Sequence, residues 1–403
     1  MSAMKAAVIG LGVEGRKAVK SLRKRGYKVY ATDINTNLNL EGLDDVEVDL
    51  GFHDMDKIKA CDIIILSPSL YNTPLKEKVE DKIICNILQE HKKPYTIGIT
   101  GTNGKTTTAL MLTKILKKWG KKVLVGGNAG GGFQGYTELI LQAAEDKYDI
   151  IVVEICDMTL DFADQCFNPN LVILTNIGRD HMNHHKTIKN YKKSLKRFLK
   201  GKNVLLNKED LLSLQLKTPK SILYGPYDGK LNLFGKFNKL NAGAAAKAAQ
   251  ILGTPKNIID SVLEDFEAPR GRIQTYKLNN AEIVIGKIDN PSAMKTILKE
   301  TDFDIIFLGT PRRNEDWRFE TLQEIGKKPP RILVLFPGLE DTTDIALKCA
   351  ENLPSKVLTA KGVEEIIKLL EEFSSEYHRI LIGGNGQERI IKIQENIEKM
   401  VGQ

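Results

Sequence analysis

The stretch Gly98–Thr108 constrains this chain more than any other part of the sequence. It follows an apolar run that ends at Ile97, and it precedes Ala109–Leu116, whose apolar residues have helical spacing. A strand, a glycine-rich turn and a helix in this order form a phosphate cradle, because N–H groups of the turn and of the helix N-terminus point at the anion. Lys105 is placed to reach the terminal phosphates, and the Thr106 hydroxyl to bind Mg²⁺. The stretch therefore predicts a nucleotide-binding α/β domain.

The strict P-loop pattern is not met, because Ile99 stands where its first glycine should be. The run Gly101–Thr107 instead resembles the G-T-N-G-K-T-T loop of the Mur ligase superfamily. This resemblance implies an enzyme that uses ATP and Mg²⁺ to join an amino acid to a carboxylate during cell-wall precursor synthesis. It assigns ATP binding to every residue of the loop, namely Gly101, Thr102, Asn103, Gly104, Lys105, Thr106 and Thr107, and it makes Lys105 catalytic.

Composition excludes several other classes of protein. A chain of 403 residues is too long for one core and predicts two or three domains. No apolar run reaches membrane-spanning length and no signal peptide precedes the first strand, so we expect a cytoplasmic protein without a membrane partner. The five scattered cysteines predict reduced thiols rather than a zinc site. The net charge of +8 comes from dispersed lysines, which favours anionic small-molecule substrates over nucleic acid.

A second glycine-rich turn lies near the start of the chain. Gly10, Gly12 and Gly15 follow a strand at G-x-G-x-x-G spacing, and the next strand ends at Asp33. Alone, this pattern predicts a dinucleotide-binding domain with Asp33 on the ribose, which leaves an NAD-dependent oxidoreductase open. A later strand ends at Ser67, and the whole order of features resembles the N-terminal domain of the Mur ligase that adds the second amino acid. That resemblance implies that Gly10, Gly12, Gly15, Asp33 and Ser67 bind a UDP-linked substrate.

Two strands of the middle region deliver polar residues at their carboxyl ends, where ligands gather in parallel α/β sheets. Glu154 ends one strand and matches the family glutamate that binds Mg²⁺; a buried acid without a cation there would be costly. His181, in the run Thr175–His185, resembles the second metal-site histidine of the family. The resemblance thus assigns the metal to Thr106, Glu154 and His181, with His181 also catalytic. It assigns substrate contacts to Asn128, Thr175 and Asn176.

The middle region also departs from the family pattern. The run Ile155–Met158 replaces the usual Ser-Ser pair, and Leu195 stands where many members carry a carbamylated lysine that holds a second Mg²⁺. A second metal ion is therefore held differently or is absent. The sequence leaves His184 and His185 open between structural and ligand roles.

Three segments of the last part of the chain contain further candidate residues for ATP or substrate binding. Asn238 and Asn241, three apart at a predicted helix start, are placed to read adenine or to cap the turn. Arg272 resembles a family arginine that contacts the ATP phosphates across the closed cleft, which makes it catalytic and ATP-binding. Arg312 follows a predicted strand and suits a substrate carboxylate. The strands predicted here span residues 282–285, 305–309, 332–336 and 380–382.

Together these features predict an α/β protein of three domains: a Rossmann-like substrate domain (1–93), a P-loop-type ATPase domain with a mostly parallel sheet (94–271) and a Rossmann-like C-terminal domain for the amino acid (272–403). We expect an ADP-forming amide ligase, monomeric or a small homo-oligomer, that acts on a nucleotide-linked peptidoglycan or pseudomurein precursor. The alternatives are a related ligase for folate-type polyglutamylation or nickel-tetrapyrrole lactam formation, an NAD-dependent oxidoreductase and a nucleotide sensor.

Overall fold

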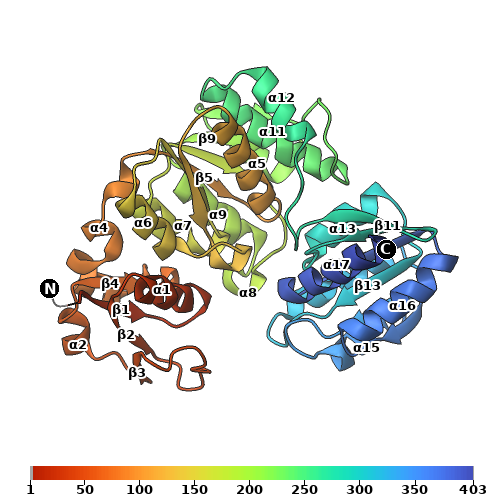
Figure 1. Ribbon diagram of the computed structural model, residues 1–403, viewed down its shortest axis with the longest axis horizontal. Coiled ribbons are helices and arrows are strands. Elements are labelled where there is room, and N and C mark those ends of the chain that lie inside the picture. The colour runs from red at the N-terminus through yellow and green to blue at the C-terminus, as the bar shows by residue number, and fades with distance from the viewer. Residues whose placement is uncertain (1–2, 403) are drawn as a thin grey trace.

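The computed structural model describes residues 3–402 and folds them into three α/β domains, each built on one sheet (Figure 1). The N-terminal sheet has the order β3-β2-β1-β4, the central sheet β10-β9-β8-β5-β7-β6 and the C-terminal sheet β11-β12-β16-β13-β14-β15. Neighbouring strands are parallel except β11 and β12. The predicted three-domain α/β fold with mostly parallel sheets is confirmed, while the boundaries after residues 93 and 271 stay predictions.

The N-terminal domain begins with a buried strand that runs into the first glycine-rich turn and a helix. Its strands are β1 (Lys5–Ile9), β2 (Lys28–Asp33), β3 (Glu47–Leu50) and β4 (Ile63–Leu66). Its helices are α1 (Val13–Lys24), α2 (Met55–Lys59), α3 (Pro74–Val79) and α4 (Ile84–Ile87), with short 3₁₀ turns at η1 (Pro68–Leu70), η2 (Glu80–Lys82) and η3 (Glu90–Lys92).

The central domain carries the phosphate loop between its first strand and helix. Its strands are β5 (Tyr95–Thr100), β6 (Val123–Gly127), β7 (Ile150–Glu154), β8 (Leu171–Leu174), β9 (Asn203–Asn207) and β10 (Ser221–Tyr224). Its helices are α5 (Lys105–Lys118), α6 (Tyr136–Glu145), α7 (Leu160–Cys166), α8 (Met182–His185), α9 (Ile188–Leu199), α10 (Leu211–Leu214), α11 (Lys236–Ile251) and α12 (Lys256–Glu264), with 3₁₀ turns η4 (Ala129–Gly131) and η5 (Asp157–Thr159).

The C-terminal domain contains the four strands predicted from sequence and two short strands that were not predicted. Its strands are β11 (Gln274–Leu278), β12 (Ala281–Ile285), β13 (Ile305–Gly309), β14 (Ile332–Phe336), β15 (Lys356–Thr359) and β16 (Arg379–Gly384). Its helices are α13 (Pro291–Glu300), α14 (Glu320–Gly326), α15 (Thr343–Ala350), α16 (Val363–Glu376) and α17 (Gln387–Val401), with the 3₁₀ turn η6 (Asp316–Phe319). The missed strands β11 and β15 are half-exposed edge strands, so their sequences lack a continuous apolar run.

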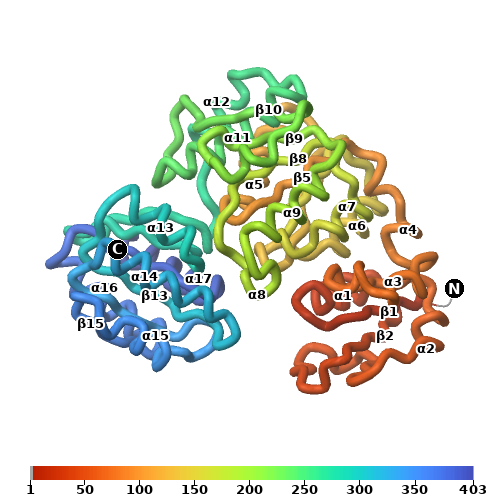
Figure 2. Tube along the Cα trace, turned by 180° about the vertical axis from the view of Figure 1, so that it is seen from behind, coloured from red at the N-terminus to blue at the C-terminus, as the bar shows by residue number. Residues whose placement is uncertain are grey.

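The apolar cores show how the domains are joined. One continuous cluster of buried residues runs from the N-terminal sheet through α6, α7 and α9 to one face of the central sheet. The other face of that sheet packs on α5, α11 and α12. The C-terminal sheet has separate clusters on its two faces, and Phe234 and Phe237 of the central domain pack against one of them. In two opposite views the central domain lies uppermost, with the N-terminal domain below it on one side and the C-terminal domain below it on the other (Figures 1 and 2).

The polar segment 91–94, where the sequence places the connection between the first two domains, includes one buried residue. His91 is fully buried, and its Nε2 lies 2.9 Å from the carbonyl oxygen of Cys166 in α7. A polar residue type does not reveal such a partner from a distant helix. Within residues 3–402, no helix is both long and apolar enough to cross a bilayer.

A buried ion pair also ties the N-terminal domain to the central domain. Arg25, which follows α1, donates to Glu138 of α6 at 2.8 Å, and the two side chains are only 14% and 11% exposed. The guanidinium of Arg25 lowers the pKa of Glu138 to about 2.

We predict that Arg25→Met lowers the free energy of unfolding by about 3 kcal/mol, because it leaves Glu138 buried without its cation. Arg23→Met, which breaks an exposed pair with Asp45, should cost less than about 1 kcal/mol. Since the pKa of Glu138 is lowered on folding, its contribution is complete above pH 4.5 and is lost as the pH falls toward 2. Urea unfolding across this pH range should show the Arg25→Met deficit shrinking as the pH falls; a constant deficit would contradict the pairing.

Candidate functional site

A cleft of about 1080 Å³ lies where the carboxyl edge of the central sheet faces the C-terminal domain. The central domain lines it with the phosphate loop, the ends of β7 and β8, and the start of α11. The opposite wall comes from the segment after β12, the start of α13 and the loop after β13. Strands of a parallel α/β sheet present their carboxyl ends together, which is why residues far apart in sequence meet here.

The phosphate loop is braced by the neighbouring strand. The side-chain amide of Asn176 accepts a hydrogen bond from the N–H of Asn103 and donates one to its carbonyl oxygen, both at 3.0 Å. The Nζ of Lys105 lies 2.6 Å from the carbonyl oxygen of Gly101 and 2.8 Å from that of Thr102. Gly104 adopts a left-handed conformation (φ 85°) and begins α5. Lys105 thus folds back onto the loop, and both of its hydrogen bonds go to loop carbonyl oxygens.

Thr175 supports the same loop. Its Oγ1 donates to the carbonyl oxygen of Thr100 at 3.2 Å, and a Cβ on Gly101 would come within 2.3 Å of that hydroxyl. The structure therefore brings Thr175 and Asn176 to the phosphate loop. Their contact with a substrate stays a prediction.

Glu154 forms a compact oxygen-rich site with the start of α5. Its Oε2 accepts a hydrogen bond from the Thr106 hydroxyl at 2.5 Å, and its Oε1 accepts one from the Asn128 side chain at 3.0 Å. The carboxylate is 1% exposed yet lines the cleft. A buried carboxylate next to a hydroxyl and a phosphate loop is the hard donor set that Mg²⁺ prefers, so these residues fit the ion.

The glycines before α6 leave the space that Glu154 occupies. A Cβ on Gly131 would lie 1.9 Å from Oε1 of Glu154, and one on Gly127 would lie 2.3 Å from its carbonyl oxygen. The structure shows a 3₁₀ turn, Ala129–Gly131, packed on Glu154. The turn needs glycine because the acid occupies the space that a side chain would take.

His181 contacts a residue that the sequence did not single out. Its Nδ1 lies 2.7 Å from Asp157 Oδ1, while Nε2 of His185 lies 2.8 Å from Asp157 Oδ2. Burial alone would raise the pKa of the Asp157 carboxyl, but His181 and His185 hold it well below its usual range. Burial likewise opposes charge on His181, yet Asp157 and Asp180 outweigh it and raise the pKa of the imidazole. Asp157 therefore fixes the ring of His181, whose role as a metal ligand stays a prediction.

The departures noted in the sequence lie around this pair. Leu195 is fully buried in α9, whereas the neighbouring Lys196 is exposed. Cys156 and Asp157 stand in place of the Ser-Ser pair, and donor atoms of Cys156, Asp157 and His181 all lie within 4.8 Å of one another. His185 is thus a buried partner of Asp157, and His184 packs against its ring.

The two asparagines at the start of α11 lie beside the phosphate loop. Asn241 donates to Asn238 at 3.1 Å, and Asn238 donates to the carbonyl oxygen of Phe234 at 2.8 Å. A Cβ on Gly104 would come within 2.2 Å of Asn241 Oδ1. The alternative that they cap the helix is wrong, because α11 begins after Gly235 and neither asparagine accepts a hydrogen bond from the first N–H groups of the helix. Recognition of adenine stays a prediction.

The arginines predicted for the cleft both line it. Arg272 donates to the carbonyl oxygen of Gly131, next to Glu154, and burial lowers the pKa of its guanidinium. Arg312 lies on the opposite wall, after β13. Arg272, in the segment before β11, thus reaches the turn that packs on Glu154, and its contact with ATP stays a prediction.

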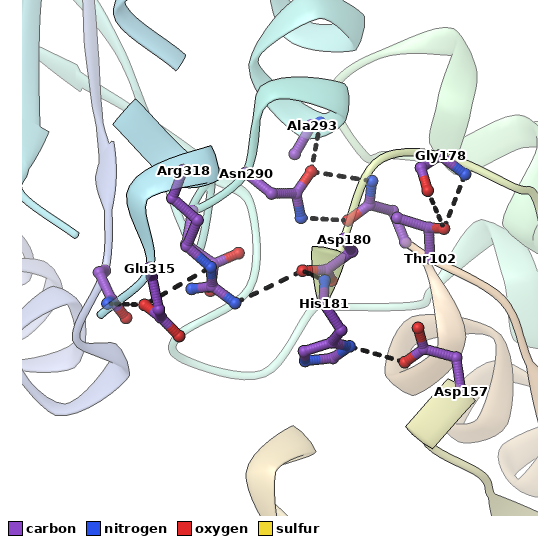
Figure 3. A network of polar contacts seen from close by, with 12 residues as sticks. Thr102, Asp157, Gly178, Asp180, His181, Asn290, Ala293, Glu315 and Arg318 are labelled. Atoms are coloured by element: carbon purple, nitrogen blue, oxygen red, sulfur yellow. Dashed lines mark hydrogen bonds and ion pairs between the residues drawn. The ribbon is translucent and has the colours of Figure 1, made fainter. Parts of the chain in front are cut away.

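Figure 3 shows a network that links the two walls of the cleft. The side-chain amides of Asn103 and Asn290 pair at 3.0 and 3.4 Å, and Asn290 also caps α13. Arg318 contacts Asp289 at 3.0 Å and Asp180 at 3.5 Å. Burial opposes charge on Asp289, but Lys287 and Arg318 lower the pKa of its carboxyl.

The first glycine-rich turn lies in the N-terminal domain, away from this network. A Cβ on Gly10 would lie 2.7 Å from Ser67, and one on Gly15 would lie 1.8 Å from the carbonyl oxygen of Gly10, so both glycines are required by close packing. Asp33 accepts a hydrogen bond from the N–H of Leu11 at 2.6 Å. Gly12 has open space around it. The pocket role predicted for Gly10, Gly12, Gly15, Asp33 and Ser67 stays a prediction.

Sequence reasoning missed a residue inside that turn. The carboxylate of Glu14 accepts hydrogen bonds from the N–H groups of Ala129 and Tyr136, at 2.6 and 3.2 Å. Tyr136 begins α6, so an acid there suits the helix dipole, although burial raises the pKa of Glu14 to about 6. Sequence reasoning also assigned no role to Asp157 or to the cleft residues Asp180, Asp289, Asn290, Glu315 and Arg318.

Comparisons with known proteins agree with this geometry. Residues 99–221 match the Mur ligase middle domain. The UDP-N-acetylmuramoylalanine--D-glutamate ligase of Thermoanaerobacter sp. (strain X514) is 26% identical over 94% of this chain and 92% of its own. A pseudomurein peptide ligase type C from Methanothermus fervidus superposes with a TM-score of 0.64 at 25% identity, covering 98% of this chain and 99% of that one. A Mycobacterium tuberculosis folylpolyglutamate synthase, solved with ADP and AMPPCP, has a TM-score of 0.63 at 13% identity, covering 78% and 93%.

We predict that Gly131→Ala lowers the free energy of unfolding by about 2 kcal/mol, because its methyl group would displace the Glu154 carboxylate. Gly130→Ala is the matched control, since its Cβ would meet nothing closer than 3.4 Å. Chemical denaturation of the two variants should separate them clearly. Equal stabilities would show that Glu154 does not lie against this turn.

Proposed function

Because the chain belongs to the Mur ligase family, whose members form carbon–nitrogen bonds with ATP, we propose that it joins an amino acid to a carboxylate on a nucleotide-linked cell-wall peptide precursor. The observation that carries this proposal is the Gly101–Thr107 loop at the cleft. Asn176 holds the loop, and the Thr106 hydroxyl donates to Glu154. The C-terminal domain forms the opposite wall of the cleft. The reaction consumes ATP and would take place in the cytoplasm, where ATP is available.

ATP would lie with its phosphates against the loop. The N–H groups of the loop and of the start of α5 face the anion, and Lys105 would move from the loop carbonyls to the terminal phosphates. Arg272 would approach from the far side of the Glu154 turn. Asn238 and Asn241, which lie beside Gly104, are our candidates for the adenosine side.

Thr106, Glu154 and His181 are the proposed ligands of Mg²⁺. When bound, the ion would neutralise charge on the γ-phosphate. Glu154 is already held by Thr106 and Asn128, and His181 by Asp157, so these side chains need little reordering. Leu195 cannot bind a cation, and we propose that α9 holds none at that position.

The chemistry would have two steps. The acceptor carboxylate attacks the γ-phosphorus of ATP, which releases ADP and leaves an acyl phosphate. The amine then attacks the carbonyl carbon, phosphate leaves, and the ammonium proton is lost. Positioning and electrostatics account for the rate of such transfers, and a closed cleft protects the acyl phosphate from water.

The acceptor would bind at the N-terminal domain and the amino acid at the C-terminal domain. Gly10, Gly12, Gly15, Asp33 and Ser67 surround the turn that we propose for the UDP group. Arg312 is the candidate for the carboxylate of the amino acid. The pseudomurein and muramoyl ligases align over at least 94% of this chain, whereas the folylpolyglutamate synthase covers 78%, which favours a wall precursor over a folate.

A screen of amino acids against UDP-sugar peptides would test the substrate. ADP release that requires both a UDP-linked acceptor and one amino acid would support the wall precursor. Release with a folate or tetrapyrrole acceptor instead would move the proposal to the related ligases, and binding of nicotinamide without ADP release would remove it.

We predict that Lys105→Ala lowers kcat for ADP release about 10³-fold, because the terminal phosphates lose their nearest cation. Lys118→Ala, an exposed lysine in the last turn of the same helix, should keep full activity. Thermal unfolding of both variants would establish that they fold. Near-normal turnover by Lys105→Ala would overturn the proposed nucleotide site.

A further inference from the structure

A buried ion cluster crosses the cleft in the network that also contains the Asn103–Asn290 pair. Arg318, in η6 of the C-terminal domain, contacts Asp289 and Glu315 of its own domain and Asp180 of the central domain. The side chains of Arg318, Asp289 and Asp180 are 8%, 9% and 10% exposed. Such charges are costly to bury unless they are paired, and Arg318 is the cation that the C-terminal domain offers to Asp180 across the cleft.

The Asp180 end of the cluster leads directly to His181. Oδ1 of Asp180 accepts a hydrogen bond from the N–H of His181 at 3.0 Å, and the same oxygen faces a guanidinium nitrogen of Arg318. Figure 3 shows this line of contacts from Arg318 through Asp180 to His181 and Asp157. One carboxylate oxygen of Asp180 therefore contacts both Arg318 of the C-terminal domain and the backbone of His181.

The backbone of His181 needs external support. It has φ 46° and ψ 40°, in the left-handed region that a residue with a side chain seldom adopts. Strain of this kind persists only where neighbouring groups over-determine the conformation. Asp157 holds the imidazole ring, and Asp180 holds the backbone N–H.

The C-terminal domain also contacts the central domain elsewhere, through the Asn290–Asn103 pair and the hydrogen bond from Arg272 to Gly131. Its two apolar clusters are its own apart from Phe234 and Phe237, so its contacts across the cleft are largely polar. One such contact, between Arg179 and Glu320, is 55% and 33% exposed and is expected to be weak. The contact of Arg318 with Asp180 is buried, and Asp180 accepts a hydrogen bond from the N–H of His181, the strained residue of the candidate site.

We propose that Arg318 is a positioning residue: through Asp180 it fixes the backbone of His181 when the C-terminal domain lies against the central domain. The proposal rests on the proposed function in one respect, that His181 takes part in the reaction. If Arg318 acts in this way, the conformation of His181 depends on the position of the C-terminal domain.

The residue next to Arg318 offers a readout that does not need activity. The Arg318 guanidinium lies 4.9 Å from the centroid of the Trp317 ring. Trp317 and Trp119 are the two tryptophans of the chain, so Trp119→Phe leaves Trp317 as the sole reporter. We expect Asp180→Asn to shift the emission of Trp317 in this background, because Arg318 loses its partner across the cleft. Glu320→Gln, which breaks the exposed cross-cleft pair, should leave the emission unchanged.

Kinetics provide the second readout. Arg318→Lys keeps the charge but loses the guanidinium fork, and we expect kcat to fall about 10- to 100-fold while KM for ATP changes less than about threefold. Asp180→Asn should cause a similar loss. Because both residues act through one contact, the double variant should lose no more than the worse single variant. Glu320→Gln should retain wild-type kcat.

Three results would overturn the proposal. They are an unchanged Trp317 emission in Asp180→Asn, multiplicative losses of kcat in the double variant, or a wild-type kcat for a folded Arg318→Lys protein. If the wild-type protein releases no ADP with any acceptor, the proposed function fails, and the emission of Trp317 still decides whether Arg318 is held by Asp180.

Discussion

The cleft depends on how closely glycine backbone approaches side chains at the carboxyl edge of the central sheet. Gly101 lies against Thr175, Gly104 against Asn241 and Gly131 against Glu154, and a Cβ at each would come within 2.3 Å of the facing oxygen. These contacts bring the phosphate loop, the start of α11 and the turn before α6 to one place. Larger residues would push the loop away from the strand ends that hold Asn176 and Glu154, so the anion cradle and the carboxylate would separate.

The order of apolar residues and glycines along the sequence predicted those parts of the fold whose contacts lie within one strand–turn–helix unit. Buried strands such as β5 and β7, the phosphate loop and the Gly10 turn could be predicted because apolar runs and glycine spacing are local properties. The resemblance to Mur ligases extended this to Glu154 and Arg272, which the structure brings to one cleft. The pairing of Asp157 with two histidines and of Arg318 with Asp180 could not be predicted, because each joins side chains from separate elements. The burial of His91 escaped prediction for the same reason.

The two outer domains are attached in different ways, and this difference bears on the proposed reaction. The N-terminal domain shares an apolar core with the central domain, and Arg25 and Glu14 add buried polar contacts across the same junction. An acceptor held there would keep a fixed position relative to the phosphate loop. The C-terminal domain meets the central domain largely through polar pairs. Polar interfaces exchange protein contacts for water at small net cost, so this domain is the one suited to open and close over the cleft.

The partners of each cation in the cleft distinguish residues suited to an anion from residues suited to structure. The hydrogen bonds of Lys105 go to the carbonyl oxygens of Gly101 and Thr102, and Arg272 donates to that of Gly131. A carbonyl dipole satisfies a donor without neutralising its charge, so the hydrogen bonds of Lys105 and Arg272 place no carboxylate directly on either cation. Arg318 instead faces carboxylates, which cancel its charge locally. Arg318 would therefore attract an anionic substrate only weakly. Its role is better explained by the position that it gives to Asp180 and, through Asp180, to the backbone of His181.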